Sequence, residues 1–343
     1  MNKINWGIIG LGNIANKFAE GFYDLSNAKV KAIASQKENK LVSFKKKFKI
    51  EDKFCFKNYD DLISCPDIDI IYIALPNSLH ARYIINCINH KKNILIEKPA
   101  VTNVKDLLII SELVANNKIY FTEGFMYRYL PYFKKIKEII KNNLLGKVIE
   151  INSTFNAKIY KQRSFFGIKF KKPDYSSRLF NKGLGGGAIL DLGCYPLSLS
   201  TFVNSLTFCV DLSDIRLEKV DTLYCESGVD IFSKAVLNFN DKFKSKITCS
   251  FKDTLDQSTK IIFENGSLHI NETWTPKQNM TINLINNHNS NIINFKNNDN
   301  IYSYQIQSIS EQLLNKKITP SFPSMSMKEI EINTSIMESW INF

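Results

Sequence analysis

An aspartate and a tyrosine carry the clearest catalytic signal in the sequence, within the glycine-rich stretch of residues 185–196 (GGGAILDLGCYP). If Ala188–Tyr195 is helical, Asp191 and Tyr195 lie one turn apart on one face. The carboxylate can then bind a substrate hydroxyl while the phenol gives or takes its proton. Because an unperturbed phenol has a pKa of about 10, Tyr195 needs a neighbouring positive charge to act as a base. A core helix with a hydrogen-bonded tyrosine is the structural alternative.

Lys98 is the candidate for that positive charge. It follows the apolar run Ile94–Ile96 within the triplet Glu97-Lys98-Pro99. Open parallel sheets bind ligands beyond the carboxyl ends of their strands, so a lysine delivered there points at the ligand. Its charge can lower the pKa of a neighbouring acid and stabilise a developing alkoxide. A solvated surface lysine is the alternative.

A second glycine-rich stretch, Gly10–Ala15 (GLGNIA), directly follows the apolar run Ile4–Ile9. In such a turn Gly10 permits a sharp bend, Gly12 leaves room for a pyrophosphate at a helix N-terminus, and Ala15 lets helix and strand pack closely. The predicted cofactor-binding residues of this turn are Gly10, Gly12, Asn13, Ile14 and Ala15. The pattern predicts a bound dinucleotide, and a glycine turn without a ligand is the alternative.

The residues after the second predicted strand, Ser35-Gln36-Lys37, indicate which dinucleotide is preferred. NAD usually takes a carboxylate on its ribose hydroxyls, about 20 residues after the glycines. Ser35 and Lys37 can instead donate to a 2′-phosphate, which a carboxylate would repel. We therefore expect Ser35, Gln36 and Lys37 to contact NADP, the favoured cofactor, while Glu38 keeps NAD open as the alternative.

The elements that must position these residues follow two different patterns. Up to Glu123, short apolar runs alternate with helical patterns, which is typical of a doubly wound parallel sheet with helices on both faces. The predicted strands are Ile4–Ile9, Val30–Ala34, Ile68–Leu75, Ile94–Ile96 and Ile119–Phe121. We therefore expect residues 1–123 to form a nucleotide-binding domain.

After Glu123 the strands become longer and alternate with period two. Residues 229–239 show this alternation, and Asn265-Gly266 is a strong hairpin signal. Helical stripes over residues 302–313 and 327–341 end the chain. For residues 124–343 these patterns predict an α/β domain with a large, mostly antiparallel sheet, open on one face and covered by helices on the other.

Length and composition exclude several classes of protein. The chain has 343 residues, 44% of them hydrophobic and 23% charged, which fits about two globular domains. No run approaches the ~18 apolar residues of a transmembrane helix, and no signal peptide opens the sequence. The seven cysteines contain no C-x-x-C pair, so we expect free thiols in the cytoplasm and neither a metal site nor a disulfide framework.

The net charge of +12 comes mostly from lysine, since only five of the 45 basic residues are arginine. Arginine is the preferred reader of bases and phosphates, so we expect no nucleic-acid partner. Residues 158–182 concentrate eight basic residues and one acidic residue, a net charge of +7. This segment is either a solvated loop or a site that attracts an anionic substrate, with Arg163 and Arg178 as the direct contacts.

The three motifs, taken in this order, resemble the Gfo/Idh/MocA family of NAD(P)-dependent oxidoreductases. That family combines an N-terminal glycine turn, a Glu-Lys-Pro after a strand and a later G-G-G-x-x-x-D-x-G-x-H/Y. Two further segments are similar to the family, Thr122–Pro131 (TEGFMYRYLP) and Pro76–His80 (PNSLH), with Leu75 where threonine is usual. The resemblance spans nearly the whole chain and implies an N-terminal Rossmann domain.

Tyr195 stands where many family members have histidine, which resembles a branch of dimeric dihydrodiol dehydrogenases and NADP-dependent D-xylose dehydrogenases. Leu130 departs from the polar residue that is typical of this branch. The resemblance implies that Tyr195 is the general acid/base, Lys98 its partner at the nicotinamide ribose, and Asp191 a carboxylate that orients the substrate. It also implies a cofactor pocket lined by Pro76, Asn77, His80 and Glu97.

We therefore expect a two-domain oxidoreductase that transfers a hydride between nicotinamide and a carbinol carbon of a sugar, polyol or sugar derivative. We also expect a homodimer or higher homo-oligomer that forms through the C-terminal sheet, and no membrane partner. Three alternatives stay open: an oxidoreductase of acidic or nucleotide-activated sugars, a non-catalytic NADP-binding protein, and a glycosidase that oxidises its substrate transiently with bound NAD.

Overall fold

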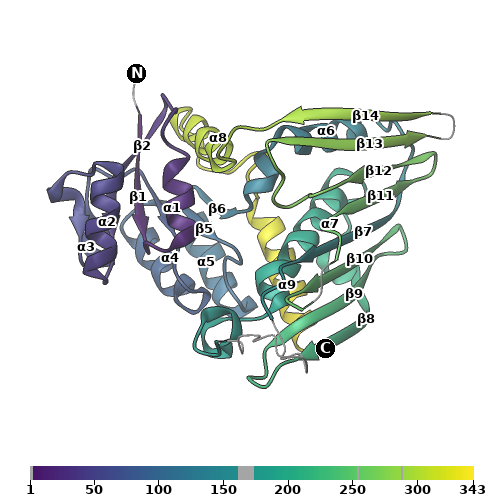
Figure 1. Cartoon of the computed structure of the whole chain (residues 1–343), viewed down its shortest axis with the longest axis horizontal. Coiled ribbons are helices and arrows are strands. Elements are labelled where there is room, and N and C mark those ends of the chain that lie inside the picture. The colour runs from purple at the N-terminus through teal and green to yellow at the C-terminus, as the bar shows by residue number, and fades with distance from the viewer. Residues whose placement is uncertain (1–2, 161–173, 253–254, 287–288) are drawn as a thin grey trace, which may run out of the picture. The chain divides into compact units, whose positions relative to one another are not determined.

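The chain divides into two compact units, neither of which is a continuous segment (Figure 1). The computed structural model describes residues 3–160, 174–252, 255–286 and 289–343. The first unit holds the residues up to Leu130 and Asn298–Glu331, and the second holds Pro131–Asn297 and Ile332–Phe343. This division differs from the predicted continuous ranges 1–123 and 124–343, because a late segment returns to the N-terminal unit.

A six-stranded parallel sheet in the order β3-β2-β1-β4-β5-β6 forms the centre of the first unit. Its strands are β1 (Ile4–Ile9), β2 (Ala28–Ala34), β3 (Cys55–Phe56), β4 (Ile70–Ile73), β5 (Asn93–Glu97) and β6 (Phe121–Gly124). The central strands are continuous apolar runs whose side chains, such as Ile8, Ile71 and Leu95, are fully buried. A sheet of this order binds ligands beyond the carboxyl ends of its strands.

The helices of this sheet alternate with its strands along the chain. They are α1 (Asn13–Glu20), α2 (Glu38–Phe48), α3 (Tyr59–Ser64), α4 (His80–Asn89) and α5 (Val104–Asn117). Helix α5 shows how the sequence sets a boundary, since the side chain of Asn103 accepts the N–H of Asp106 at 2.8 Å and caps the helix. All five predicted strands form, β1 with the predicted bounds and the other four with shifted ones, whereas β3 and α3 are additional.

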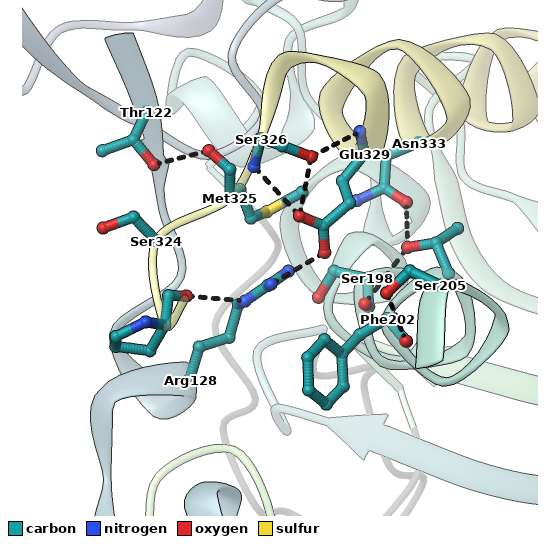
Figure 2. A network of polar contacts seen from close by, with 12 residues as sticks. Thr122, Arg128, Ser198, Phe202, Ser205, Ser324, Met325, Ser326, Glu329 and Asn333 are labelled. Atoms are coloured by element: carbon teal, nitrogen blue, oxygen red, sulfur yellow. Dashed lines mark hydrogen bonds and ion pairs between the residues drawn. The ribbon is translucent and has the colours of Figure 1, made fainter. Parts of the chain in front are cut away.

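The returning segment is tied to the first unit by buried polar contacts. Helix α8 (Tyr302–Leu314) contacts β1 and β2. Figure 2 shows the segment that follows it, where Arg128 donates to the carbonyl oxygen of Pro323 at 3.1 Å and forms a 2.7 Å ion pair with Glu329. Because the guanidinium is almost fully buried, these bonds fix the segment on the N-terminal unit.

An eight-stranded sheet in the order β14-β13-β12-β11-β7-β10-β9-β8 forms the centre of the second unit. Its strands are β7 (Val148–Asn156), β8 (Ile215–Tyr224), β9 (Asp230–Phe239), β10 (Phe243–Ser250), β11 (Thr259–Phe263), β12 (Gly266–Ile270), β13 (Asn279–Asn286) and β14 (Ser290–Lys296). Strands β7 and β10 pair in parallel, and the other neighbours pair antiparallel. The predicted Asn265-Gly266 hairpin joins β11 and β12.

Helices cover one face of this sheet. The helices of the second unit are α6 (Pro131–Lys141), α7 (Cys194–Leu206) and the part of α9 (Met327–Ile341) from Ile332 onward. The hydroxyl groups of Ser200 on α7 and Ser245 on β10 lie 2.6 Å apart, and Trp340 on α9 donates to Ser233 on β9 at 2.8 Å. The prediction of one parallel sheet and one large, mostly antiparallel sheet is confirmed.

Candidate active site

The turn between β1 and α1 has the backbone geometry of an anion site. Gly10 has a φ of +87°, and a Cβ there would stand 2.4 Å from the carbonyl oxygen of Ala74. Gly12 is the N-cap of α1 and has no side chain that could accept the first N–H groups of the helix. These N–H groups are therefore available to a ligand. No described atom lies within 4 Å of the place that a Cβ on Gly12 would take. The turn therefore fits a pyrophosphate.

The end of β2 carries a hydroxyl, an amide and an ammonium group. Ser35 is buried, and its Oγ accepts the N–H of Lys37 at 3.1 Å, while the side chains of Gln36 and Lys37 are exposed. Glu38, the acid nearest in sequence, forms an ion pair with Lys57 at 2.6 Å. The residues present at this position therefore suit a 2′-phosphate, which needs donors and positive charge.

Lys98 lies in the loop after β5, and buried side chains hold this loop from two sides. On one side Glu123, in β6, accepts the N–H of Ala100 at 2.8 Å. On the other side Nδ1 of His80 lies 2.9 Å from the carbonyl oxygen of Pro99 and 3.2 Å from that of Ala100. The ring of His80 is fully buried, so this predicted pocket residue supports the loop that carries Lys98.

Glu97 and Asn77 lie at the same edge of the sheet. The phenol of Tyr72 donates to the carboxylate of Glu97, which also accepts the N–H of Lys98 at 3.3 Å. Asn77 is buried and opens the short 3₁₀ turn that leads into α4, directly after Pro76. The loops after β4 and β5 therefore bring the predicted pocket residues to the edge at which doubly wound sheets bind ligands.

Glu123 is a buried acid that the sequence analysis did not single out as a site residue. Burial raises the pKa of its carboxyl to about 7, against the opposing effects of the Ala100 N–H and the charge of Arg128. One of its oxygens, Oε2, has no hydrogen-bond partner among the described residues. The carboxyl therefore changes charge near neutral pH beside the loop of Lys98. An acid two residues after the apolar run Ile119–Phe121 was the available signal.

Asp191 and Tyr195 lie at the start of the buried helix of the second unit. Ile189–Gly193 forms a π-helical turn that runs into α7, so the predicted helix forms but begins with a wider turn than an α-helix has. Asp191 forms a 3.2 Å ion pair with Arg178, whose side chain is half exposed. These two predicted substrate-binding residues therefore contact each other, whereas Arg163 lies outside the described residues.

Aromatic side chains that the sequence analysis did not identify surround the ring of Tyr195. Phe155 lies edge-on to it with ring centroids 5.0 Å apart, and Trp274 lies 6.0 Å away. The indole of Trp274 is itself fixed, because its Nε1 donates to the carbonyl oxygen of Thr154 at 2.7 Å. This packing restricts the phenol ring to one orientation. Isolated aromatic residues gave no signal because aromatics are frequent throughout the chain.

Two further properties concern the described part of the chain as a whole. Within it, no group of three or more histidine, cysteine, aspartate or glutamate side chains is placed to hold a metal ion. Its helices include none with both the length and the apolar character that crossing a membrane demands.

Two family models match consecutive parts of the sequence. One describes an oxidoreductase family with an NAD-binding Rossmann fold and matches residues 4–125, and the other describes the GFO/IDH/MocA C-terminal domain and matches residues 133–269. The chain belongs to the Gfo/Idh/MocA family. The resemblance drawn from the motifs is confirmed, and the six-stranded unit is the Rossmann domain of an NAD(P)-dependent oxidoreductase.

Relatives within the Gfo/Idh/MocA family span most of the chain. The sequence is 28% identical to trans-1,2-dihydrobenzene-1,2-diol dehydrogenase of Xenopus tropicalis, over 97% of this chain and 96% of that protein. It is 24% identical to D-xylose 1-dehydrogenase (NADP(+)) 2 of Haloferax volcanii, over 80% and 76%. The fold is similar to that of aldose-aldose oxidoreductase from Caulobacter crescentus, with a TM-score of 0.85 at 18% identity over 99% and 97%.

Proposed function

We propose that this protein catalyses the NADP-dependent oxidation of a carbinol carbon in a sugar, polyol or sugar derivative, or the reverse reduction. The observation that carries the proposal is the position of Tyr195 at the head of α7, directly after the turn that carries Asp191. A phenol and a carboxylate so placed suit a hydroxyl substrate, because one group moves the proton and the other accepts a hydrogen bond.

Three side chains have separate roles in the proposed reaction. Tyr195 exchanges the proton of the reacting hydroxyl, and Asp191 orients the substrate through another of its hydroxyl groups. The ammonium of Lys98 lowers the free-energy cost of the negative charge that develops on oxygen. A bound NADP(H) accepts or supplies the hydride at its nicotinamide ring.

We infer a preference for NADP(H) over NAD(H) from the end of β2. Ser35 and Lys37 offer donors where an acid would serve the ribose hydroxyls of NAD, and Glu38 is engaged with Lys57. The matched D-xylose dehydrogenase is named for NADP, which supports the same preference. Fluorescence titration with NADPH and NADH tests it, and equal affinity for the two would contradict it.

An acidic or nucleotide-activated sugar is the second candidate substrate, and one observation favours it. Arg178 keeps a half-exposed guanidinium beside Asp191, where it can bind a carboxylate or phosphate with two parallel hydrogen bonds. The described part of the basic segment adds Lys158 and Lys182. A neutral sugar would leave this positive charge without a counterpart on the substrate.

A substrate screen tests the proposed function. The purified chain is incubated with NADP⁺ or NAD⁺ and neutral sugars, sugar acids or nucleotide sugars, and the reduced nicotinamide is followed by absorbance. NADP-dependent turnover of any of these supports an oxidoreductase, and the preferred group names the substrate class. NADPH binding without turnover of the whole panel would indicate a non-catalytic protein. A cofactor that survives purification, with glycoside cleavage that needs none added, would indicate a glycosidase.

We also propose that the chain forms a homodimer or higher homo-oligomer through the open face of the eight-stranded sheet and works in the cytoplasm. The face opposite α7 exposes Lys234, Lys246 and Lys260 and pairs Lys246 with Glu150 at 2.6 Å. A two-fold interface places the same surface patch of both subunits against each other, so this face would contact its own copy. Light scattering coupled to size exclusion measures the mass.

The proposed location in the cytoplasm is supported by the cysteines. All seven are free thiols, which fits a reducing compartment.

A further inference from the structure

Two of the three glycines at 185–187, which precede the turn of Asp191 and helix α7, lie close against other parts of the protein. A Cβ on Gly186 would stand 2.6 Å from the carbonyl oxygens of Arg178 and Leu179. Gly187 has a φ of +130°, and a Cβ there would stand 2.2 Å from Oδ1 of Asp230. The second and third glycines of this motif are therefore needed because the protein's own groups approach the backbone closely.

Asp230 is the residue whose carboxylate lies against the backbone of Gly187. It opens β9 and is buried, and its Oδ2 accepts the N–H of Ile189 at 2.7 Å. The N–H of Ala188 also bonds to the carboxylate. Ile189 is the first residue of the π-helical turn, so the carboxylate satisfies backbone donors that this helix start would otherwise leave unpaired.

We propose that Asp230 is a positioning residue of the catalytic site, which holds the turn carrying Asp191 and the head of α7 carrying Tyr195 in the geometry for proton transfer. Asp191 lies two residues and Tyr195 six residues after Ile189, on one hydrogen-bonded stretch of backbone. π-Helical turns are rare and occur frequently at functional sites, and the bond from Ile189 to Asp230 fixes the residue at which this one begins.

The charge of Asp230 is balanced by backbone dipoles. Its hydrogen-bond donors are backbone N–H groups, at Ile189 and Ala188. Of the titratable groups packed around it, Cys249 on β10 interacts with it electrostatically, and burial keeps the pKa of that thiol well above its usual value. Burial also raises the pKa of Asp230 to about 6. Backbone hydrogen bonds oppose this effect of burial and favour the charged carboxylate.

Substitutions at Asp230 separate positioning from overall stability. Asp230→Asn keeps the size and an acceptor oxygen but removes the charge, and Asp230→Ala removes both. Asp221→Asn, on the exposed surface of β8, is the matched control. Gly187→Ala disturbs the same contact from the backbone side. Thermal unfolding and NADPH titration accompany every variant, because the Rossmann domain should keep its cofactor affinity when the second unit is altered.

The first measurement is amide hydrogen exchange of peptides that contain residues 187–195. We expect Asp230→Asn and Asp230→Ala to lose protection there while the Rossmann peptides stay unchanged, and Asp221→Asn to behave as the wild type. This arm needs no substrate, so it remains decisive if the proposed function fails because the wild type turns over no sugar.

The second measurement rests on the proposed function and uses the sugar that the wild type turns over fastest. We expect kcat to fall about tenfold in Asp230→Asn and about a hundredfold in Asp230→Ala, with unchanged NADPH affinity, because small misplacements of reacting groups cost rates of this order. Protonation of Asp230 should contribute to a fall of kcat below about pH 6, and that contribution should be absent in Asp230→Asn. Unchanged protection and kcat in folded variants, or failure of Asp230→Asn, Asp230→Ala and Gly187→Ala all to fold, would overturn the proposal.

Discussion

Nδ1 of His80 lies 2.9 Å from the carbonyl oxygen of Pro99, the residue that follows Lys98. Nε2 of the same ring lies 2.9 Å from the carbonyl oxygen of Leu75. Carbonyl oxygens only accept, so the ring nitrogen that carries the proton donates to one loop while the ring packs against the other. The ring thus joins the loops after β4 and β5, and it does so where no solvent reaches it.

Replacement of His80 should therefore loosen Lys98. In His80→Gln a flexible amide replaces the rigid ring that contacts both loops, so one of the two buried contacts is lost. We expect kcat to fall about tenfold, because such a loss costs about 1–3 kcal/mol, and the affinity for NADPH to weaken. Steady-state kinetics and NADPH titration measure both. His90→Gln, on the exposed end of α4, is the control, and equal behaviour of the two variants would contradict the assignment.

The second prediction concerns how Glu123 makes the stability of the folded protein depend on pH. Its folded pKa is raised to about 7, above the usual value of 4.5, so the unfolded chain releases this proton first as pH rises. Between these two values the carboxyl therefore disfavours the folded state increasingly, by up to about 3 kcal/mol above pH 7. Glu123→Gln removes the effect, and its gain in unfolding free energy over the wild type should grow between pH 5 and pH 8.

Urea unfolding of both proteins at the two pH values measures this gain. Glu112→Gln is the control, because Glu112 is exposed on α5 and should change little at either pH. A Glu123→Gln variant whose advantage is the same at pH 5 and pH 8 would show that the buried carboxyl does not titrate in this range.

The elements of the Rossmann domain and the hairpin at Asn265-Gly266 were predictable because their signals are local. Apolar runs of four to six residues and turn-forming pairs depend only on neighbouring sequence. The return of residues 298–331 to the first unit was not predictable, since it depends on contacts such as Arg128–Glu329, 201 residues apart. Sequence periodicity reports which face of a helix is apolar but not which sheet that face covers.

The candidate site divides in the same way. Lys98, Asp191 and Tyr195 stand out because their motifs have fixed spacing. Glu123 and Asp230 do not stand out, because each is a single acid without a motif. Each acts by accepting a backbone N–H from a distant part of the sequence, Glu123 from Ala100 and Asp230 from Ile189. A buried acceptor at the end of a strand has no spacing pattern of its own, so it emerges only when the fold brings the two segments together.

The third prediction tests the proton-transfer role of Tyr195. Tyr195→Phe keeps the ring and its packing against Phe155 and Trp274, and removes the hydroxyl. We expect kcat to fall at least ~10²-fold, as is typical for the loss of a general acid/base, with little change in NADPH affinity. Tyr224→Phe, exposed on β8, is the control. Near-normal turnover in Tyr195→Phe would mean that the proton moves through another group.

The fourth prediction changes the cofactor. Ser35→Asp places a carboxylate at the end of β2, where it repels a 2′-phosphate and accepts a hydrogen bond from a 2′-hydroxyl. We expect weaker NADPH binding and tighter NADH binding, measured by fluorescence titration. Ser43→Asp makes the same substitution on the exposed surface of α2 and should leave the preference unchanged. A preference that moves equally in both variants would indicate a long-range effect of net charge.

The fifth prediction decides between a neutral and an anionic substrate at Arg178. If the guanidinium beside Asp191 binds a substrate anion, Arg178→Gln should raise the apparent KM for a sugar acid about tenfold, because charge-assisted hydrogen bonds are worth about 1.5–3 kcal/mol. The KM for the corresponding neutral sugar should hardly change.

Salt and a second arginine separate direct contact from general attraction. Exposed charges are screened over about 8 Å at physiological ionic strength, so salt should raise the wild-type KM for the acid and have less effect in Arg178→Gln. Arg216→Gln is the matched control, since Arg216 forms an exposed 3.0 Å ion pair with Asp241 in the same unit. If both substrates react equally well in all three proteins, Arg178 serves only to neutralise Asp191, and a neutral pentose or hexose becomes the substrate that the site selects.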